Sequence, residues 1–165
     1  MRVFTPTFQR NMILPQAMQA LVPANGAEIS SDNLAIQTAI CSAVDIVTAR
    51  QRGRAEAHAL GIDAANVTSV AAAISEVARN IVQHAREGVI MMDVVVSGAR
   101  RGLRIVARDQ GPGIPDVTQA LQYGYSRGRG LGVGLPGAKW LMDVFEIHST
   151  PGHGTTVLMI KWLRE

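Results

Sequence analysis

Residues 109–137 carry the residue types that are suited to holding a phosphate. The stretch begins with an acid, in Asp109-Gln-Gly-Pro-Gly, and continues after a spacer into Gly128-Arg-Gly-Leu-Gly-Val-Gly. Glycines at alternate positions let a ligand approach the backbone closely, because they carry no Cβ. A helix that begins near Val133 would point free N–H groups and the positive end of its dipole at that ligand, and phosphate is the usual occupant. The stretch therefore predicts a nucleotide-phosphate loop, with a plain surface loop as the alternative.

Two common phosphate loops do not fit this sequence. A P-loop ends in Gly-Lys followed by Ser or Thr, whereas Lys139 lies beyond the last glycine and precedes Trp140. A dinucleotide fingerprint needs a strand directly before the glycines and an acid about 20 residues after them, and neither is evident. The glycines therefore belong to a different kind of nucleotide site.

A polar pair interrupts the most regular helical segment of the sequence. Glu76 and Asn80 are four residues apart, so they lie on the same side of a helix. A carboxylate can accept a proton from a hydroxyl group, and an amide oxygen is a hard ligand suited to Mg²⁺. A solvated helix edge is the ordinary explanation for such a pair, and the glycine loop favours the functional one. His84 continues this face, but it has no second histidine nearby, so we assign it to structure or surface.

Composition narrows the class of protein. The chain has 165 residues, of which 47% are apolar and 18% charged, which is typical of one globular domain. The net charge of +3, the scattered arginines and the 4% aromatic content argue against a nucleic-acid surface. The single Cys41 excludes an internal disulfide, and no run approaches the roughly 18 apolar residues of a membrane span. We expect a cytoplasmic protein without nucleic-acid or membrane partners.

Hydrophobic spacing and turn residues divide the chain after residue 31 into short elements. We expect Asp45 to cap the first helix and Asn66 or Thr68 to open the second. The order predicts an α+β, two-layer α/β sandwich, in which helices cover one face of a mixed, mostly antiparallel sheet. In chain order, the expected elements are a strand or helix at 34–43, helices at 45–60 and 66–88, strands at 89–97 and 103–108 joined by a turn at 98–102, a helix at 133–143, and strands at 145–149 and 155–162. The apolar stripe of the first helix is Ile46, Val47, Ala49, Ala57 and Leu60.

Three segments in this order resemble the N, G1 and G2 boxes of the GHKL (Bergerat-type) ATP-binding fold. They are Glu76-Val-Ala-Arg-Asn, Asp109-Gln-Gly-Pro-Gly and Gly130-Leu-Gly-Val-Gly, and Gly154-Thr resembles the closing motif. Within GHKL proteins the chain is similar to the small anti-sigma serine/threonine kinases, most of all to RsbT-like switch kinases. Residues 45–51, 73–80 and 134–143 carry that closer match. The resemblance implies a kinase domain at 32–165, preceded by an extension at 1–31.

The resemblance implies roles for single residues. Asp109 would accept a hydrogen bond from the adenine amino group, Gly113 would let the base lie close, and Thr155 would add a hydroxyl nearby. Asn80 would hold Mg²⁺ between the ATP phosphates, and Glu76 would be the catalytic base. The complete set of ATP-binding residues implied is Asn80, Asp109, Gly111, Gly113, Gly128, Gly130, Leu131, Gly132, Val133, Gly134 and Thr155.

Two arginines stand in the segment that forms the lid in this family. Arg127 and Arg129 are candidate catalytic residues, because either could reach the γ-phosphate and spread its charge in the transition state. The related anti-sigma kinases place an arginine here, whereas RsbT-like lids have small polar residues. Whether either side chain is catalytic or solvated therefore stays open.

The resemblance implies an ATP-dependent serine/threonine protein kinase of a partner-switching, stressosome-type module. Its substrate would be a small STAS-domain scaffold or antagonist protein, and it would then activate a PP2C-type phosphatase. The alternative is an anti-sigma or partner-binding module that uses ATP only structurally. Glu76 favours chemistry, because binding alone needs no base. A homodimer stays open, and residues 1–31 could dock a partner, mediate dimerisation or reflect a start upstream of Met12 or Met18.

Overall fold

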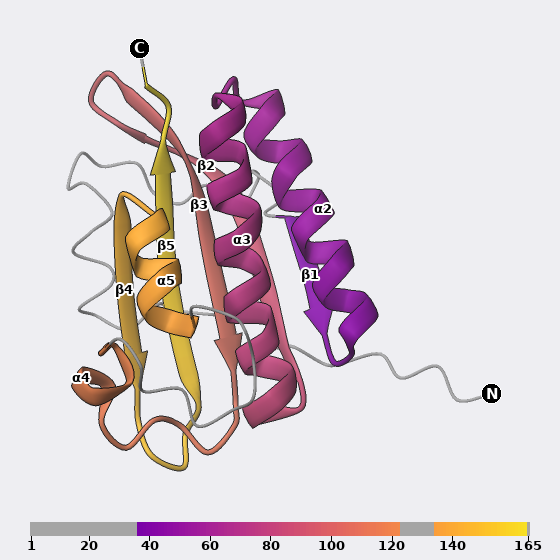
Figure 1. The fold of residues 1–165 in the computed structure, drawn as a ribbon, viewed down its shortest axis with the longest axis vertical. Helices are drawn as coiled ribbons and strands as arrows, with labels where there is room; N and C mark the ends of the chain where they lie inside the picture. Colours follow the sequence, from indigo (N-terminus) through magenta and orange to yellow (C-terminus); the bar gives the residue numbers. More distant parts are fainter. Residues whose placement is uncertain (1–35, 123–133, 165) are drawn as a thin grey trace.

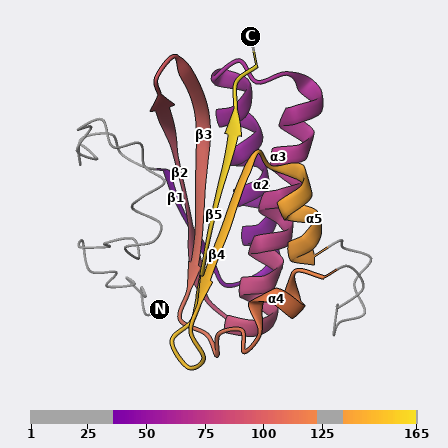
Figure 2. The same cartoon turned by 90° about the vertical axis from the view of Figure 1, so that its left-hand side faces the viewer.

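The computed structural model describes residues 36–122 and 134–164, which form a five-stranded sheet with helices on one face (Figure 1). Figure 2 shows the same molecule from the side, with the helices gathered on one side of the sheet. In chain order the elements are β1 (Ile36–Ile40), α2 (Ala43–Ala59), α3 (Ala64–Asn80), the π-helical turn η1 (Ile81–Ala85), β2 (Gly88–Ser97), β3 (Arg100–Asp109), α4 (Val117–Ala120), α5 (Gly134–Leu141), β4 (Val144–Ser149) and β5 (Thr155–Trp162). None of the helices among the described residues is long and apolar enough to cross a membrane.

The strand order is β1-β2-β3-β5-β4. Each neighbouring pair is antiparallel, so the described sheet contains no parallel pair. β3 is the central strand, and it runs beyond both predicted limits, 103 and 108, from Arg100 to Asp109. The predicted α+β sandwich is confirmed, and the open choice at residues 34–43 is settled in favour of a strand, β1.

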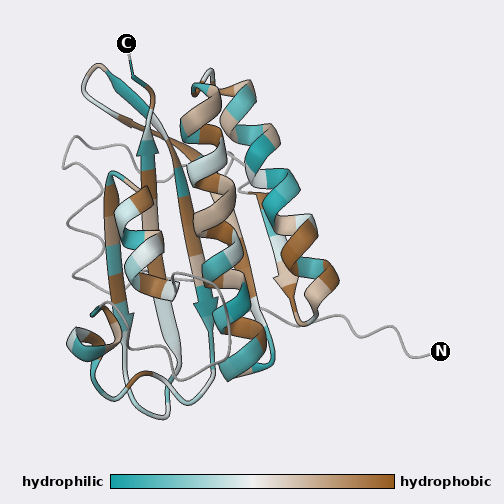
Figure 3. Ribbon diagram, viewed as in Figure 1, coloured by the Kyte–Doolittle hydropathy of each residue, from teal (hydrophilic) through white to brown (hydrophobic). Residues whose placement is uncertain are grey.

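The core lies between the sheet and α3, which runs between α2 and α5 (Figure 1). Val70, Ile74 and Val77 of α3 are buried, and they belong to the same apolar cluster as Ile105 in β3 and Met159 in β5. Figure 3 shows hydrophobic residues in the middle of the central strands and hydrophilic ones at the end of β3. The apolar residues of α3 recur at helical spacing, so they face one partner surface, the sheet.

α2 packs through small residues. Its buried positions are Ala49, Gly53 and Ala57, which are spaced four apart and so form one row. A Cβ at Gly53 would collide with the side chain of Ile74 in α3, so this row brings the two helices close together. Val47 is 39% exposed, so its predicted place in the apolar stripe is wrong.

The first residues of α2 also differ from the prediction. Ser42 is the N-cap, and Asp45 lies three positions later, inside the helix. The Asp45 carboxylate accepts hydrogen bonds from the Ser42 N–H and hydroxyl, each at 2.8 Å, and from the Cys41 N–H at 3.1 Å. These bonds, led by the one from the Ser42 hydroxyl, hold the pKa of Asp45 below its usual value. Asp45 thus stabilises the helix start without being its cap.

The predicted limits of the second helix also differ from those of α3. Asp63 is the N-cap, and its carboxylate accepts a hydrogen bond from the Asn66 N–H at 3.0 Å. Asn66 and Thr68 therefore lie inside the helix. The α-helix ends at Asn80 and continues as the π-helical turn η1, short of the predicted end near Gly88.

The hairpin turn between β2 and β3 is shorter than expected. Ser97 pairs with Arg100 and Val96 with Arg101, so only Gly98 and Ala99 form the turn. Gly98 has a φ of 60°, which is the signature of a type II′ turn, where glycine takes the first central position. The predicted turn over 98–102 is wrong because three of its residues, Arg100, Arg101 and Gly102, pair with β2.

We expect Asp45→Ala to lower the free energy of unfolding by about 1 kcal/mol at pH 7, because the start of α2 loses its acceptor. The pKa of Asp45 is lowered in the folded protein. Its contribution is therefore complete above the ordinary aspartate pKa of about 3.9 and is lost as the pH falls through the lowered value. Urea unfolding at pH 7 and near pH 3 measures both effects. Glu56→Gln in the same helix is the control, and an equal loss in both variants would contradict this role.

Candidate functional site

The end of β3 and the start of β5 meet at Asp109. Its Oδ1 atom accepts hydrogen bonds from the backbone N–H of Gly111 at 2.8 Å and of Thr155 at 3.2 Å. Both bonds go to the same oxygen, and within the described chain this leaves Oδ2 able to accept another hydrogen bond. The structure therefore brings the predicted G1 residues and the closing motif together around one oriented carboxylate.

Two glycines let the loops beside Asp109 pack backbone against backbone. Gly154 has a φ of 87°, and a Cβ there would collide with the carbonyl oxygen of Asp109. Gly113 has a φ of 71°, and a Cβ there would collide with the carbonyl oxygen of Thr150. The sequence predicts that Gly113 lets a ligand lie close, and the structure adds a second reason, the contact with the facing loop. Any other residue at these two positions would push the loops apart.

Ser149, which the sequence analysis missed, joins the same two loops. Its hydroxyl accepts from the Ile114 N–H at 2.8 Å and donates to the Gly154 carbonyl at 3.1 Å. It also lies 2.8 Å from the Thr155 hydroxyl, which must donate here because the Ser149 proton is already used. The Thr155 hydroxyl thus has a protein partner, and it can still accept a hydrogen bond from a ligand. A serine at the end of a strand carries no sequence signal for this role.

The Glu76 carboxylate lies at the start of α5. Its Oε1 atom is 2.8 Å from Nη1 of Arg79, and its Oε2 atom accepts a hydrogen bond from the Gly134 N–H at 3.2 Å. Glu76 is only 9% exposed, so the surface-edge explanation of this residue does not hold. Gly134 is the first residue of α5, and the free N–H groups of a helix start favour an anion. A carboxylate is therefore bound where the sequence predicts a phosphate.

Asn80 is the last residue of α3, one turn after Glu76, and η1 begins directly after it. π-helical turns occur often at functional sites, because the extra residue shifts the side chains that follow. A Cβ on Gly111 would lie 2.6 Å from the Cβ of Ala85, so η1 packs against the Asp109 loop. η1 therefore connects the Glu76–Asn80 pair to the other half of the site. His84, in the same turn, is exposed, as its assignment to structure or surface allows.

Asn80 could hold a magnesium ion only together with waters and the phosphate oxygens of a bound nucleotide. Among the described residues, no group of three or more His, Cys, Asp or Glu side chains could hold a metal. Mg²⁺ bound to protein usually keeps one or two protein oxygens, several waters and phosphate oxygens. An amide oxygen beside a nucleotide matches that pattern. Seven of the predicted site residues lie outside the described residues, namely Arg127, Gly128, Arg129, Gly130, Leu131, Gly132 and Val133.

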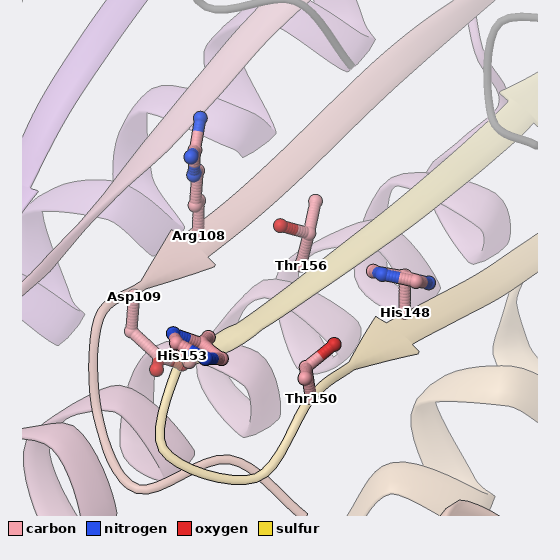
Figure 4. A pocket seen from close by; sticks show the side chains of 7 residues that line it. Arg108, Asp109, His148, Thr150, His153 and Thr156 are labelled. Atoms are coloured by element: carbon pink, nitrogen blue, oxygen red, sulfur yellow. The ribbon is translucent and has the colours of Figure 1, made fainter. Parts of the chain in front are cut away.

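A hollow of about 210 Å³ adjoins this site where β3, β5 and β4 come together (Figure 4). Arg108, Thr156 and His148 lie side by side on the three strands. They alternate with residues that face the helices, so this row lies on the opposite face of the sheet. The hollow therefore shares the backbone around Asp109 with the site but opens away from Glu76. The residues that line it are Arg108, Asp109, His148, Thr150, His153, Gly154 and Thr156.

Comparison with known proteins identifies several relatives. Residues 42–161 match the histidine kinase-like ATPase domain family. The chain is 48% identical over 120 residues to the serine/threonine-protein kinase RsbT of Bacillus subtilis (strain 168), a match that covers 73% of this chain and 90% of that protein. It is 30% identical over 103 residues to an anti-sigma F factor of Thermoanaerobacter sp. (strain X514), covering 59% and 71% of the two chains.

A solved structure supports the fold. The crystal structure of the RsbU and RsbW domains of a Mycobacterium tuberculosis protein matches with a TM-score of 0.57 at 20% identity. The match covers 79% of this chain but spans only 33% of the length of the other. At this identity the likeness shows the fold alone.

We expect Gly154→Ala to weaken both the fold and the site far more than Gly152→Ala. Both glycines have positive φ, at 87° and 79°, so each substitution carries the left-handed cost of about 1–2 kcal/mol. Nothing lies within 4 Å of a Cβ at Gly152, whereas one at Gly154 collides with Asp109. We expect Gly154→Ala to lower the free energy of unfolding, measured with urea, by roughly 3 kcal/mol or more and to weaken nucleotide binding. Equal losses in the two variants would contradict the backbone contact.

Proposed function

The chain belongs to the histidine kinase-like ATPase family, among its RsbT-type serine/threonine-protein kinases, and we propose that it phosphorylates a partner protein in a partner-switching module. The observation that carries this proposal is the buried Glu76 carboxylate at the N-terminus of α5. That position places a proton acceptor beside an anion-binding helix start, which is the arrangement that phosphoryl transfer requires.

The adenine end of ATP fits the loops around Asp109. The adenine amino group is a donor, and the Oδ2 atom of Asp109 is a suitable acceptor because Oδ1 is held by two N–H groups of the chain. The Thr155 hydroxyl, beside it, can accept a further hydrogen bond. Gly113 completes the close packing of this loop. These contacts support the adenine-binding roles proposed for Asp109, Gly111, Gly113 and Thr155.

The phosphate end of ATP fits the start of α5. The Gly134 N–H can donate to only one anion well, so a bound phosphate competes with Glu76 for it. Nucleotide binding would then free the Oε2 atom of Glu76, while Arg79 still holds Oε1. We propose that ATP in this way converts a helix-capping carboxylate into an available base. Further N–H donors would come from Gly128, Gly130, Leu131, Gly132 and Val133, which lie outside the described residues.

In the proposed transfer, the oxygen of a serine or threonine hydroxyl attacks the γ-phosphorus of ATP. The hydroxyl proton passes to Oε2 of Glu76, and the bond between the γ-phosphorus and the β–γ bridging oxygen breaks, with its electron pair leaving on ADP. Asn80 is proposed to hold Mg²⁺, which when bound neutralises charge on the β- and γ-phosphates. Arg127 or Arg129 is proposed to contact the γ-phosphate.

The relatives of this chain also suggest what its protein partners are. The RsbT and anti-sigma F factor relatives support a kinase that works by exchanging protein partners. We propose that the substrate is a small STAS-type scaffold or antagonist protein and that the released kinase activates a PP2C-type phosphatase. The module would work in the cytoplasm, where ATP is supplied, and a homodimer would be compatible with it.

We expect Glu76→Gln to lower phosphate transfer from ATP to a STAS-type partner by roughly 100- to 10,000-fold, because the amide cannot take the proton. ATP affinity should not fall, since Asp109 and α5 remain and a neutral amide competes less well than a carboxylate for the Gly134 N–H. The measurement is transfer of labelled γ-phosphate under Mg-ATP, with nucleotide binding followed in parallel. Glu87→Gln, which removes an exposed carboxylate, is the control.

The same assay distinguishes the kinase from a binding module. If the native chain binds ATP and captures the partner without labelling it, ATP is a structural ligand and the role proposed for Glu76 is wrong. If Glu76→Gln transfers phosphate as well as the native chain does, another group is the base.

We expect Asp109→Asn to reduce the preference for ATP over GTP. The amide oxygen can replace Oδ1 and keep the bonds to Gly111 and Thr155, which leaves the amide NH₂ facing the base. Two donors then meet at the adenine amino group, at a cost of about 1–3 kcal/mol, or roughly 10- to 100-fold in affinity. Guanine presents an acceptor at the same position, so GTP should lose less affinity than ATP. Equilibrium binding of both nucleotides tests this, and an unchanged ratio would contradict it.

A further inference from the structure

The face of the sheet that turns away from the helices carries a second apolar cluster, beside the polar row of Arg108, Thr156 and His148. In Figure 2 the described helices all lie on the other side of the sheet. This surface, called here the open face, consists of Met91, Val95, Val106, Val144, Leu158, Ile160 and Trp162. An antiparallel sheet with one face in water normally alternates apolar and polar residues, so that the outer face is polar. The open face is therefore built as an interior surface.

The low exposed fractions of residues on the open face agree with its apolar composition. Leu158 is 1% exposed, Ile160 4% and Val106 6%, although no described helix covers them. The ion pair between Arg104 and Asp93 lies on the same face, with side chains 11% and 19% exposed. This pair satisfies its own charges, so whatever covers the face does not need to supply any. An uncharged apolar segment is the chemistry that fits.

We propose that residues 1–35 of the same chain cover the open face through the apolar run at residues 12–22. That run, Met-Ile-Leu-Pro-Gln-Ala-Met-Gln-Ala-Leu-Val, contains no charged residue. The charged residues of the whole segment are Arg2, Arg10, Glu28 and Asp32. Covering a sheet face with such a run removes apolar surface from water on both sides, which is the main favourable contribution in folding.

The connection of this segment to the sheet makes the contact feasible. It leads directly into β1, the edge strand. β5 is three strands away from β1, or roughly 14 Å at the usual spacing of about 4.8 Å. Residues 23–35 can span up to about 40 Å when extended. Residues 123–133, by contrast, connect α4 to α5, and both helices lie on the other side of the sheet.

This proposal is independent of the phosphotransfer reaction and changes the predicted division at residue 31. Residues 1–35 become a third layer of the domain and are no longer a separate appendage. The open face is then closed to other proteins, so a substrate would meet the kinase on its helical side. A second copy of the chain is the competing occupant.

The direct test is photo-crosslinking in the full-length chain. Benzoylphenylalanine is placed at Val95 on the open face, and at the adjacent Val94 as a control. Val94 points to the other side of the sheet and is 42% exposed. We expect the probe at Val95 to link to peptides from residues 1–35 in a product with the mass of one chain, and the probe at Val94 not to do so. A product with the mass of two chains, or a Val95 probe without links to residues 1–35, would overturn the proposal.

Substitutions in the segment test its apolar character. With the probe at Val95, Leu14→Asp combined with Leu21→Asp should lower the cross-linking yield at least about tenfold, because each substitution puts a charge where an apolar side chain would be buried. Asn11→Asp combined with Gln19→Asp adds the same charge at polar positions and should leave the yield within about a factor of two. Equal effects of the two pairs would show that the apolar run does not bind the face.

Discussion

The contact between the backbone of Gly154 and the backbone of Asp109 is the constraint on which the site depends. It lets the turn after β4 close onto the end of the central strand, so that the Thr155 N–H reaches the Asp109 carboxylate. The Ser149 hydroxyl then joins the same turn to the loop at Ile114. A carboxylate at a strand end would otherwise rotate freely. Here its orientation is set before any ligand arrives, so a ligand that binds to it does not have to order it.

The part of the site around Glu76 depends on one backbone donor, the N–H of Gly134. The Gly134 N–H donates to only one good anionic partner, and in this structure that partner is Glu76. Arg79 holds the other carboxylate oxygen, so Glu76 keeps one fixed contact when the other is given up. A buried carboxylate with all its contacts satisfied costs little to maintain. The same contacts leave no unpaired charge on the Glu76 carboxylate at the start of α5.

The two faces of the sheet carry two separate apolar clusters. Its helical face carries the main core and places α3 and α5 so that their residues meet. Its open face carries a second apolar cluster with an internally neutralised ion pair. Because β strands alternate their side chains, the residues of the main core and those of the open face are interleaved along β3 and β5. Packing on either face therefore affects the geometry of the site.

The sequence by itself determined the order and type of nearly every element, the apolar stripe of α3 and the segments around Glu76, Asp109 and Gly154. These signals are local, since helical spacing and glycine-rich turns are set by neighbouring residues. Only the tertiary structure decided that Ser42 and Asp63 are the caps, that α3 ends in a π-helical turn, and that the β2–β3 turn has two residues. It also decided which groups hold the site carboxylates, because those hydrogen bonds join residues 46 and 58 positions apart. Such contacts exist only once the sheet and helices have packed, and no pattern of neighbouring residues encodes them.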